Sequence, residues 1–83
     1  MPLFMDVHQT LPEGVTADAL FDAHKADLQT QGKYGVKYLN FWGDPAGGKA
    51  FCLVEAPDAE TATEVHREAH GLLADEIYPV FQG

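Results

Sequence analysis

The chain has no serine and only one cysteine, Cys52, among its 83 residues. The absence of serine excludes a serine nucleophile, and a lone cysteine excludes both an internal disulfide and a zinc site built from several cysteines. Basic residues are also scarce, since five Lys and Arg stand against thirteen Asp and Glu, which gives a net charge of -8. This charge argues against nucleic acid or an anionic membrane surface as the main partner, and it favours cations.

Long hydrophobic runs are absent as well. No apolar stretch approaches the length of a membrane span, and the N-terminus lacks the charged and hydrophobic regions of a signal peptide. We therefore expect a cytoplasmic protein, because a free thiol stays reduced there. The length predicts one domain over residues 1–83, of a size that gains stability from oligomerisation.

Turn signals and hydrophobic patterning divide the chain into six elements. Thr16 and Asp58 are suited to cap the N-termini of two helices, and a glycine-rich turn over residues 43–48 predicts a hairpin between two strands. The predicted elements are strands over Leu3–His8, Val36–Trp42, Lys49–Glu55 and Glu76–Phe81, and helices over Ala17–Gln31 and Asp58–His70.

The order strand, helix, strand, strand, helix, strand predicts an α+β protein with the ferredoxin-like, or split βαβ, fold. Its antiparallel sheet would carry two helices on one face. Simple alternation in the second strand places Tyr38 and Trp42 on one face of the sheet, and Leu39 and Phe41 on the other. Both faces would then be apolar, so we expect a homodimer that packs either sheet to sheet or edge to edge.

Two histidines on the second helix, His66 and His70, are the most specific chemical feature of the sequence. Residues four apart lie on neighbouring helical turns, so the two imidazoles can converge on one metal ion. Taking 100° per residue, His66 falls at the edge of the apolar face and His70 lies closer to solvent. The alternative is a helix flank with two half-exposed histidines that bind nothing. Arg67 replaces the glutamate of the zinc-protease motif, which excludes that chemistry.

On the first helix, His24 lies in the apolar stripe, and Asp27 follows three residues later on the same side. The pair could share a ligand. The alternative is a buried neutral histidine that is hydrogen-bonded to a backbone carbonyl or to Asp27.

Carboxylates and histidines on the strands supply further candidates. Asp6 and His8 share one strand face and could chelate an ion or simply face water, whereas Glu76 begins the last strand and could add an oxygen ligand. Cys52 lies between two apolar residues, which predicts a buried, unreactive thiol. The candidate metal ligands are therefore His66, His70, His24, Asp27, Glu76, His8 and Asp6.

Several segments together resemble the small bacterial nickel-binding proteins with a ferredoxin-like fold, formerly a domain of unknown function. The resemblance covers essentially the whole chain, and its most specific motif is the second helix with the turn that follows. The matching segments are Phe4–His8, Ala23–Leu28, Tyr34–Tyr38, Phe51–Pro57 and Val65–Tyr78. The resemblance implies a cytoplasmic homodimer that binds Ni²⁺ on its surface and sequesters excess metal.

The residues themselves agree with metal binding but do not identify the metal. Ni²⁺ accepts imidazole nitrogens and carboxylate oxygens, but so do zinc, cobalt and copper ions. The leading hypothesis is thus a non-enzymatic binder of divalent metal, with nickel implied by the resemblance alone. A second hypothesis is a small-molecule enzyme of the dimeric α/β-barrel type, such as a monooxygenase, with a pocket formed by His24, Asp6 and Trp42. A third is an accessory domain without a site.

Overall fold

A computed structural model describes residues 1–83. The chain forms four strands, two α-helices and a short 3₁₀ helix. Their bounds are β1 Leu3–His8, α1 Ala17–Thr30, η1 Gln31–Tyr34, β2 Lys37–Asp44, β3 Lys49–Glu55, α2 Ala59–Ala69 and β4 Glu76–Val80.

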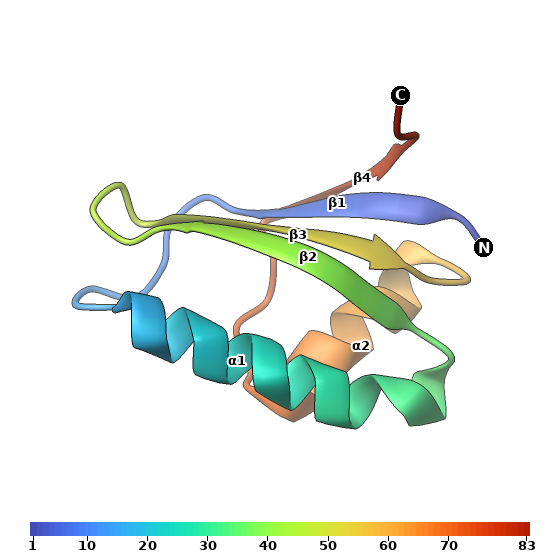
Figure 1. The fold of residues 1–83 in the computed structure, drawn as a ribbon, viewed down its shortest axis with the longest axis horizontal. Helices are drawn as coiled ribbons and strands as arrows, with labels where there is room; N and C mark the ends of the chain where they lie inside the picture. The colour runs from blue at the N-terminus through green and yellow to red at the C-terminus, as the bar shows by residue number, and fades with distance from the viewer.

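The four strands form one sheet in the order β2-β3-β1-β4, and every neighbouring pair is antiparallel. Both α-helices lie against the same face of this sheet, and the other face carries no helix (Figure 1). This arrangement confirms the predicted βαββαβ, ferredoxin-like fold. Neither α-helix is long and apolar enough to cross a membrane.

Local sequence signals place the element boundaries. Thr16 Oγ1 accepts a hydrogen bond from the Ala19 amide at the start of α1, and Asp58 Oδ1 accepts one from the Thr61 amide at the start of α2. Both predicted caps are thus confirmed. The bounds of β1 and β3 match the prediction, whereas β2 begins at Lys37 and continues to Asp44, two residues beyond Trp42.

A β-bulge in β2 overturns the predicted faces of that strand. Tyr38 pairs with Val54 and Asn40 pairs with Leu53, so Leu39 is an extra residue between them. The extra residue shifts the alternation by one. Tyr38 and Phe41 therefore both face the helices, whereas Trp42 lies on the opposite face with 51% of its surface exposed.

The core lies between the sheet and the helices. It is built from side chains of β1, β2, β3 and α2 together with those of the connecting segments, and a smaller cluster joins α1 to β3. The main cluster consists of Phe4, Val36, Tyr38, Cys52, Val54, Ala56, Ala62 and Val65. Four polar or charged side chains are buried in the same layer, namely Asp6, His8, Asp27 and His66. Such groups are costly to bury without partners, so their contacts identify the place to search for function.

Candidate metal centre

His66 lies at the centre of the buried polar cluster. Its position on α2 directs the imidazole toward the sheet, where only 2% of the residue remains exposed. The alternative of a half-exposed His66 is therefore wrong. The buried face of α2 is wider than its apolar residues alone indicate, because it includes His66 beside Ala62 and Val65.

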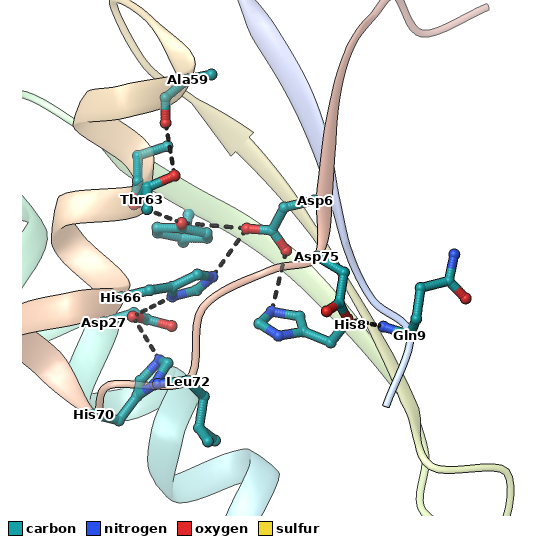
Figure 2. A network of polar contacts seen from close by, with 12 residues as sticks. Asp6, His8, Gln9, Asp27, Ala59, Thr63, His66, His70, Leu72 and Asp75 are labelled. Carbon is teal, nitrogen blue, oxygen red and sulfur yellow. Dashed lines mark hydrogen bonds and ion pairs between the residues drawn. The ribbon is translucent and has the colours of Figure 1, made fainter. Parts of the chain in front are cut away.

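Both ring nitrogens of His66 contact carboxylates (Figure 2). Nδ1 lies 2.8 Å from Oδ1 of Asp27 on α1, and Nε2 lies 2.9 Å from Oδ2 of Asp6 on β1. One imidazole thus connects three elements, with a carboxylate on each side. A histidine that donates from both nitrogens is the imidazolium form, which balances one of the two buried negative charges.

The pKa values in this cluster follow from burial and from these contacts. Burial alone would lower the pKa of His66, but the hydrogen bonds and charges of Asp27 and Asp6 outweigh it and raise the pKa to about 9. Burial would raise the pKa of Asp6, but contacts with His66 and His8 hold it well below its usual range. The pKa of Asp27 is lowered against burial in the same way by His66 and His70. The cluster is therefore charged at neutral pH.

His70 joins the cluster from the end of α2. Its Nε2 lies 3.0 Å from Asp27 Oδ1, and its ring centroid is 4.8 Å from that of His66. The two rings thus lie close together, as their four-residue spacing predicts. Gly71 adopts a left-handed conformation with φ of 79°, which turns the chain so that the Leu72 amide donates a hydrogen bond to His70 Nδ1. Because Nδ1 accepts this bond, Nε2 carries the proton.

Asp6 and His8 face the helices rather than water. They are 1% and 6% exposed, and Asp6 lies opposite Cys52 in the pairing of β1 with β3. His8 Nε2 is 3.4 Å from Asp6 Oδ1, and Tyr38 Oη donates a hydrogen bond to Asp6 Oδ2 over 3.3 Å. The expectation of a buried Cys52 is confirmed, and both burial and the nearby Asp6 charge raise the pKa of its thiol.

Two groups of donor atoms in this cluster are compact enough to hold a metal ion. Asp27, His66 and His70 form the first, which we call the helix site. Asp6, His8, Cys52 and His66 form the second, which we call the sheet site. Within each group the donor atoms lie within 4.8 Å of one another, and His66 belongs to both. Ligands bonded at about 2.1 Å lie at most about 4.2 Å apart, so small movements bring either group into a coordinating arrangement.

His24 lies beside the cluster without joining it by a hydrogen bond. Its Nδ1 is buried and has no hydrogen-bond partner, so the expected bond to Asp27 or to a backbone carbonyl is not formed. The ring packs on Phe41 with centroids 4.7 Å apart, and burial lowers the pKa of His24. It lines a pocket together with Asp27, His66 and His70. Trp42 takes no part in this pocket, because the bulge turns it to the opposite face.

Glu76 lies outside both donor groups. Its Oε1 accepts a hydrogen bond from Gln9 Nε2, and the residue pairs with Val7 at the start of β4. Val7 belongs to the set of β1 side chains that alternates with Asp6 and His8, so Glu76 lies on the sheet face away from the helices.

Sequence reasoning did not include Cys52 and Tyr38 in the candidate site. The available signal was the alternation in β1 and β3, which places Asp6 and Cys52 on the same face as apolar core residues. A carboxylate in such a position requires a buried partner, and that requirement points to the histidines of α2.

Comparisons with known proteins identify the family of this chain. Residues 4–80 match the family described as nickel responsive protein SCO4226-like. The crystal structure of SCO4226 from Streptomyces coelicolor A3(2) is similar to this chain, with a TM-score of 0.88, 43% sequence identity and coverage of 98% of each chain. No curated protein sequence matches the chain. The match extends over nearly the whole length and includes both donor groups, so the chain belongs to the SCO4226-like family of nickel-responsive proteins.

Proposed function

We propose that this protein binds Ni²⁺ without catalysing a reaction, and that it serves in nickel sequestration or homeostasis. The observation that carries the proposal is the helix site, in which Asp27, His66 and His70 place their donor atoms within 4.8 Å of one another. Membership of a nickel-responsive family supports nickel as the ion.

The donor set of the helix site suits this ion. Two imidazole nitrogens and a carboxylate oxygen are ligands that Ni²⁺ accepts, with water completing its coordination. The net charge of -8 raises the local concentration of divalent cations around the protein. An entering dication replaces the proton between Asp27 and His66, and the ring proton of His70 moves from Nε2 to Nδ1, so the two positive charges of the ion balance the carboxylates of Asp27 and Asp6.

His24 supplies a further donor in the proposed site. Its ring lines the same pocket as the three helix-site residues, and it brings a buried nitrogen that has no other partner. Burial lowers its pKa, which keeps the ring in the neutral form that binds metals. Glu76, which is engaged with Gln9 outside both groups, is not part of the site that we propose.

The size of the pocket favours an ion over an organic substrate. Its cavity volume is about 30 Å³, enough for one or two water molecules. Sites for small organic molecules usually enclose about 300–1,000 Å³. The enzyme hypothesis with a pocket around His24 is therefore the weaker of the two.

Isothermal titration with NiCl₂ tests the proposal. We expect His70→Ala and Asp27→Asn to weaken nickel binding at least about tenfold, since each removes a donor. Asp22→Asn is the matched control, because it removes one exposed carboxylate from the same helix as Asp27 and changes the net charge equally. Circular dichroism of each variant verifies that it folds. Unchanged binding in folded His70→Ala and Asp27→Asn would overturn the proposal.

We propose in addition that the protein acts as a homodimer joined through the sheet face without helices. The register places bulky apolar side chains from all four strands on this open sheet face, and two of them, Trp42 and Tyr78, are 51% and 47% exposed. The residues that define the face are Leu3, Met5, Val7, Trp42, Phe51 and Tyr78. A two-fold contact would bury the same patch of both copies.

A further inference from the structure

The sheet site holds a buried carboxylate oxygen that the protein satisfies only through one long contact. Oδ1 of Asp6 forms no well-aligned hydrogen bond although the residue is only 1% exposed, and its ion-pair partner, His8 Nε2, lies 3.4 Å away. A carboxylate oxygen that is so weakly paired in the core is costly. A cation bound beside it would remove that cost.

The fold brings the four donors of this site to one point. Asp6 and His8 are two residues apart on β1 and so share the helix-facing side, and Cys52 lies directly across from Asp6 on β3. His66 approaches from α2 and contacts Asp6 through Nε2. The four donor atoms lie within 4.8 Å of one another. Two rigid strands and a helix therefore hold the group.

We propose that Asp6, His8, Cys52 and His66 form a second metal site, which is selective for thiophilic dications such as Cd²⁺ and Zn²⁺. A metal ion bound in this sheet site excludes a metal ion from the helix site. The first part rests on the sheet site alone. The exclusion rests also on the proposed function, because it concerns the site that we assign to Ni²⁺.

The reason for exclusion is the sharing of His66. Metal binding displaces one of the two ring protons of the His66 imidazolium to solvent. The neutral imidazole that results has one nitrogen with a free lone pair, whereas the other nitrogen keeps its proton. A metal in the helix site takes the Nδ1 lone pair and leaves the Nε2 proton donated to Asp6. A metal in the sheet site takes the Nε2 lone pair and leaves the Nδ1 proton donated to Asp27. In each state the carboxylate that is not a ligand orients the ring.

The thiol of Cys52 is what separates the two sites chemically. The helix site offers nitrogen and oxygen donors only, whereas the sheet site adds sulfur, and sulfur favours soft metals. Coordination replaces the S–H bond by a metal–sulfur bond, and the thiol proton leaves to solvent. Two imidazoles, a carboxylate and a thiolate then give four protein ligands, which suits the tetrahedral preference of these ions.

The pocket provides a route to the sheet site. It is lined by His8, Cys52 and His66 from the sheet site and by Asp27 and His70 from the helix site. An ion entering between α1 and the sheet therefore meets both groups. Cys52 and His70 distinguish them, because each belongs to one group only.

Titration of the reduced, metal-free protein with CdCl₂ tests the proposal. We expect the ultraviolet sulfur-to-cadmium charge-transfer band to saturate at one Cd²⁺ per chain, as counted by elemental analysis after desalting. Cys52→Ser, which keeps the side-chain size, is expected to lose the band and to weaken Cd²⁺ binding at least about tenfold. His70→Ala is the matched variant and is expected to keep the band. Isothermal titration of the cadmium-loaded wild type with Ni²⁺ should then show no heat of nickel binding.

The possible outcomes separate the two proposals. Absence of the band in the folded wild type would overturn the sheet site, whatever nickel does. Two tightly held Cd²⁺ ions per chain, or nickel binding to the cadmium-loaded protein with the band intact, would overturn the exclusion. A cadmium band that saturates at one ion in a protein that never binds Ni²⁺ would contradict the proposed function and support the sheet site.

Discussion

Asp6 and His66, which lie 60 residues apart in the sequence, form a buried ion pair with 2.9 Å between Oδ2 and Nε2. The pair ties the first strand to the second helix at a point where both side chains are at most 2% exposed. The other ring nitrogen of His66, Nδ1, contacts Asp27 on α1. The polar cluster therefore fixes how the two helices lie on the sheet, as well as holding donor atoms together.

Replacement of Asp6 by Asn should destabilise the protein by about 3 kcal/mol in free energy of unfolding. The variant leaves the charged ring of His66 with one carboxylate in a buried setting, and breaking a buried pair has a cost of this size. Glu68→Gln is the control, since it removes an exposed ion pair with Lys33 and should change stability little. Urea denaturation measures both variants. Similar effects for the two would show that the Asp6 pair does not stabilise the fold.

Stability should depend on pH with losses on both sides of a plateau. Folding raises the pKa of His66 from 6.5 to about 9, so its contribution is complete below pH 6.5 and is lost as the pH rises through about 9. Folding lowers the pKa values of Asp6 and Asp27 from 3.8, so their contribution is complete above that value and is lost in more acidic solution. Calorimetric melting temperatures should peak between about pH 4 and 6.5. A rise in melting temperature from pH 7 to 9 would contradict the assignment.

His24→Leu should change stability and metal binding in opposite directions. Removing a buried nitrogen without a partner is expected to raise the free energy of unfolding by about 1 kcal/mol. The same change removes a proposed nickel donor, so affinity should fall about tenfold. Urea denaturation and nickel titration of the same preparation measure the two effects. Unchanged nickel affinity would remove His24 from the proposed site.

Metal binding in the helix site should release the amide of Leu72. Coordination through His70 Nε2 moves the ring proton to Nδ1, which then cannot accept the Leu72 hydrogen bond of 3.0 Å. We expect hydrogen exchange at this amide, followed by mass spectrometry, to accelerate when Ni²⁺ is added. The Ala19 amide, which is bound to the Thr16 cap, is the internal control. Equal exchange with and without metal would exclude Nε2 of His70 as a ligand.

The proposed dimer should depend on Trp42. Trp42→Glu places a charge on the open sheet face, and sedimentation velocity should change from dimer to monomer. Leu28→Glu is the control, because Leu28 is also exposed, at 44%, but lies on α1 rather than on that face. A wild-type monomer, or a dimer that is lost only in Leu28→Glu, would contradict the proposed interface.

The fold was largely predictable because its signals are local. Thr16 and Asp58 mark the helix starts, and alternation marks β1 and β3 with their observed bounds. The bulge in β2 was not predictable, because a run of apolar and aromatic residues fits either face. Only the pairing with β3 shows that Leu39 is the extra residue.

The candidate site was predictable in part. The four-residue spacing predicts that His66 and His70 meet, since helical geometry fixes it. The burial of His66 was missed because its partner Asp6 lies on a distant strand, and nothing in the local pattern connects them. Asp6 and His8 were assigned to either chelation or solvent for the same reason. A polar residue in an alternating strand identifies its face only after the opposite layer is known.

The bulge at Leu39 has a consequence for relatives that pair this strand without it. In a homologue of the same length whose β2 alternates regularly, the inner and outer rings would exchange, so that an indole would replace the phenyl group that packs on His24. Such a protein would place a larger ring beside its pocket and present a different outer surface to other copies. Deletion of Leu39 alone would leave both rings in place, because Phe41 would still pair with Cys52 and Trp42 with Phe51. The register of β2 against β3, rather than its length, is therefore the practical criterion for deciding which relatives share this chemistry.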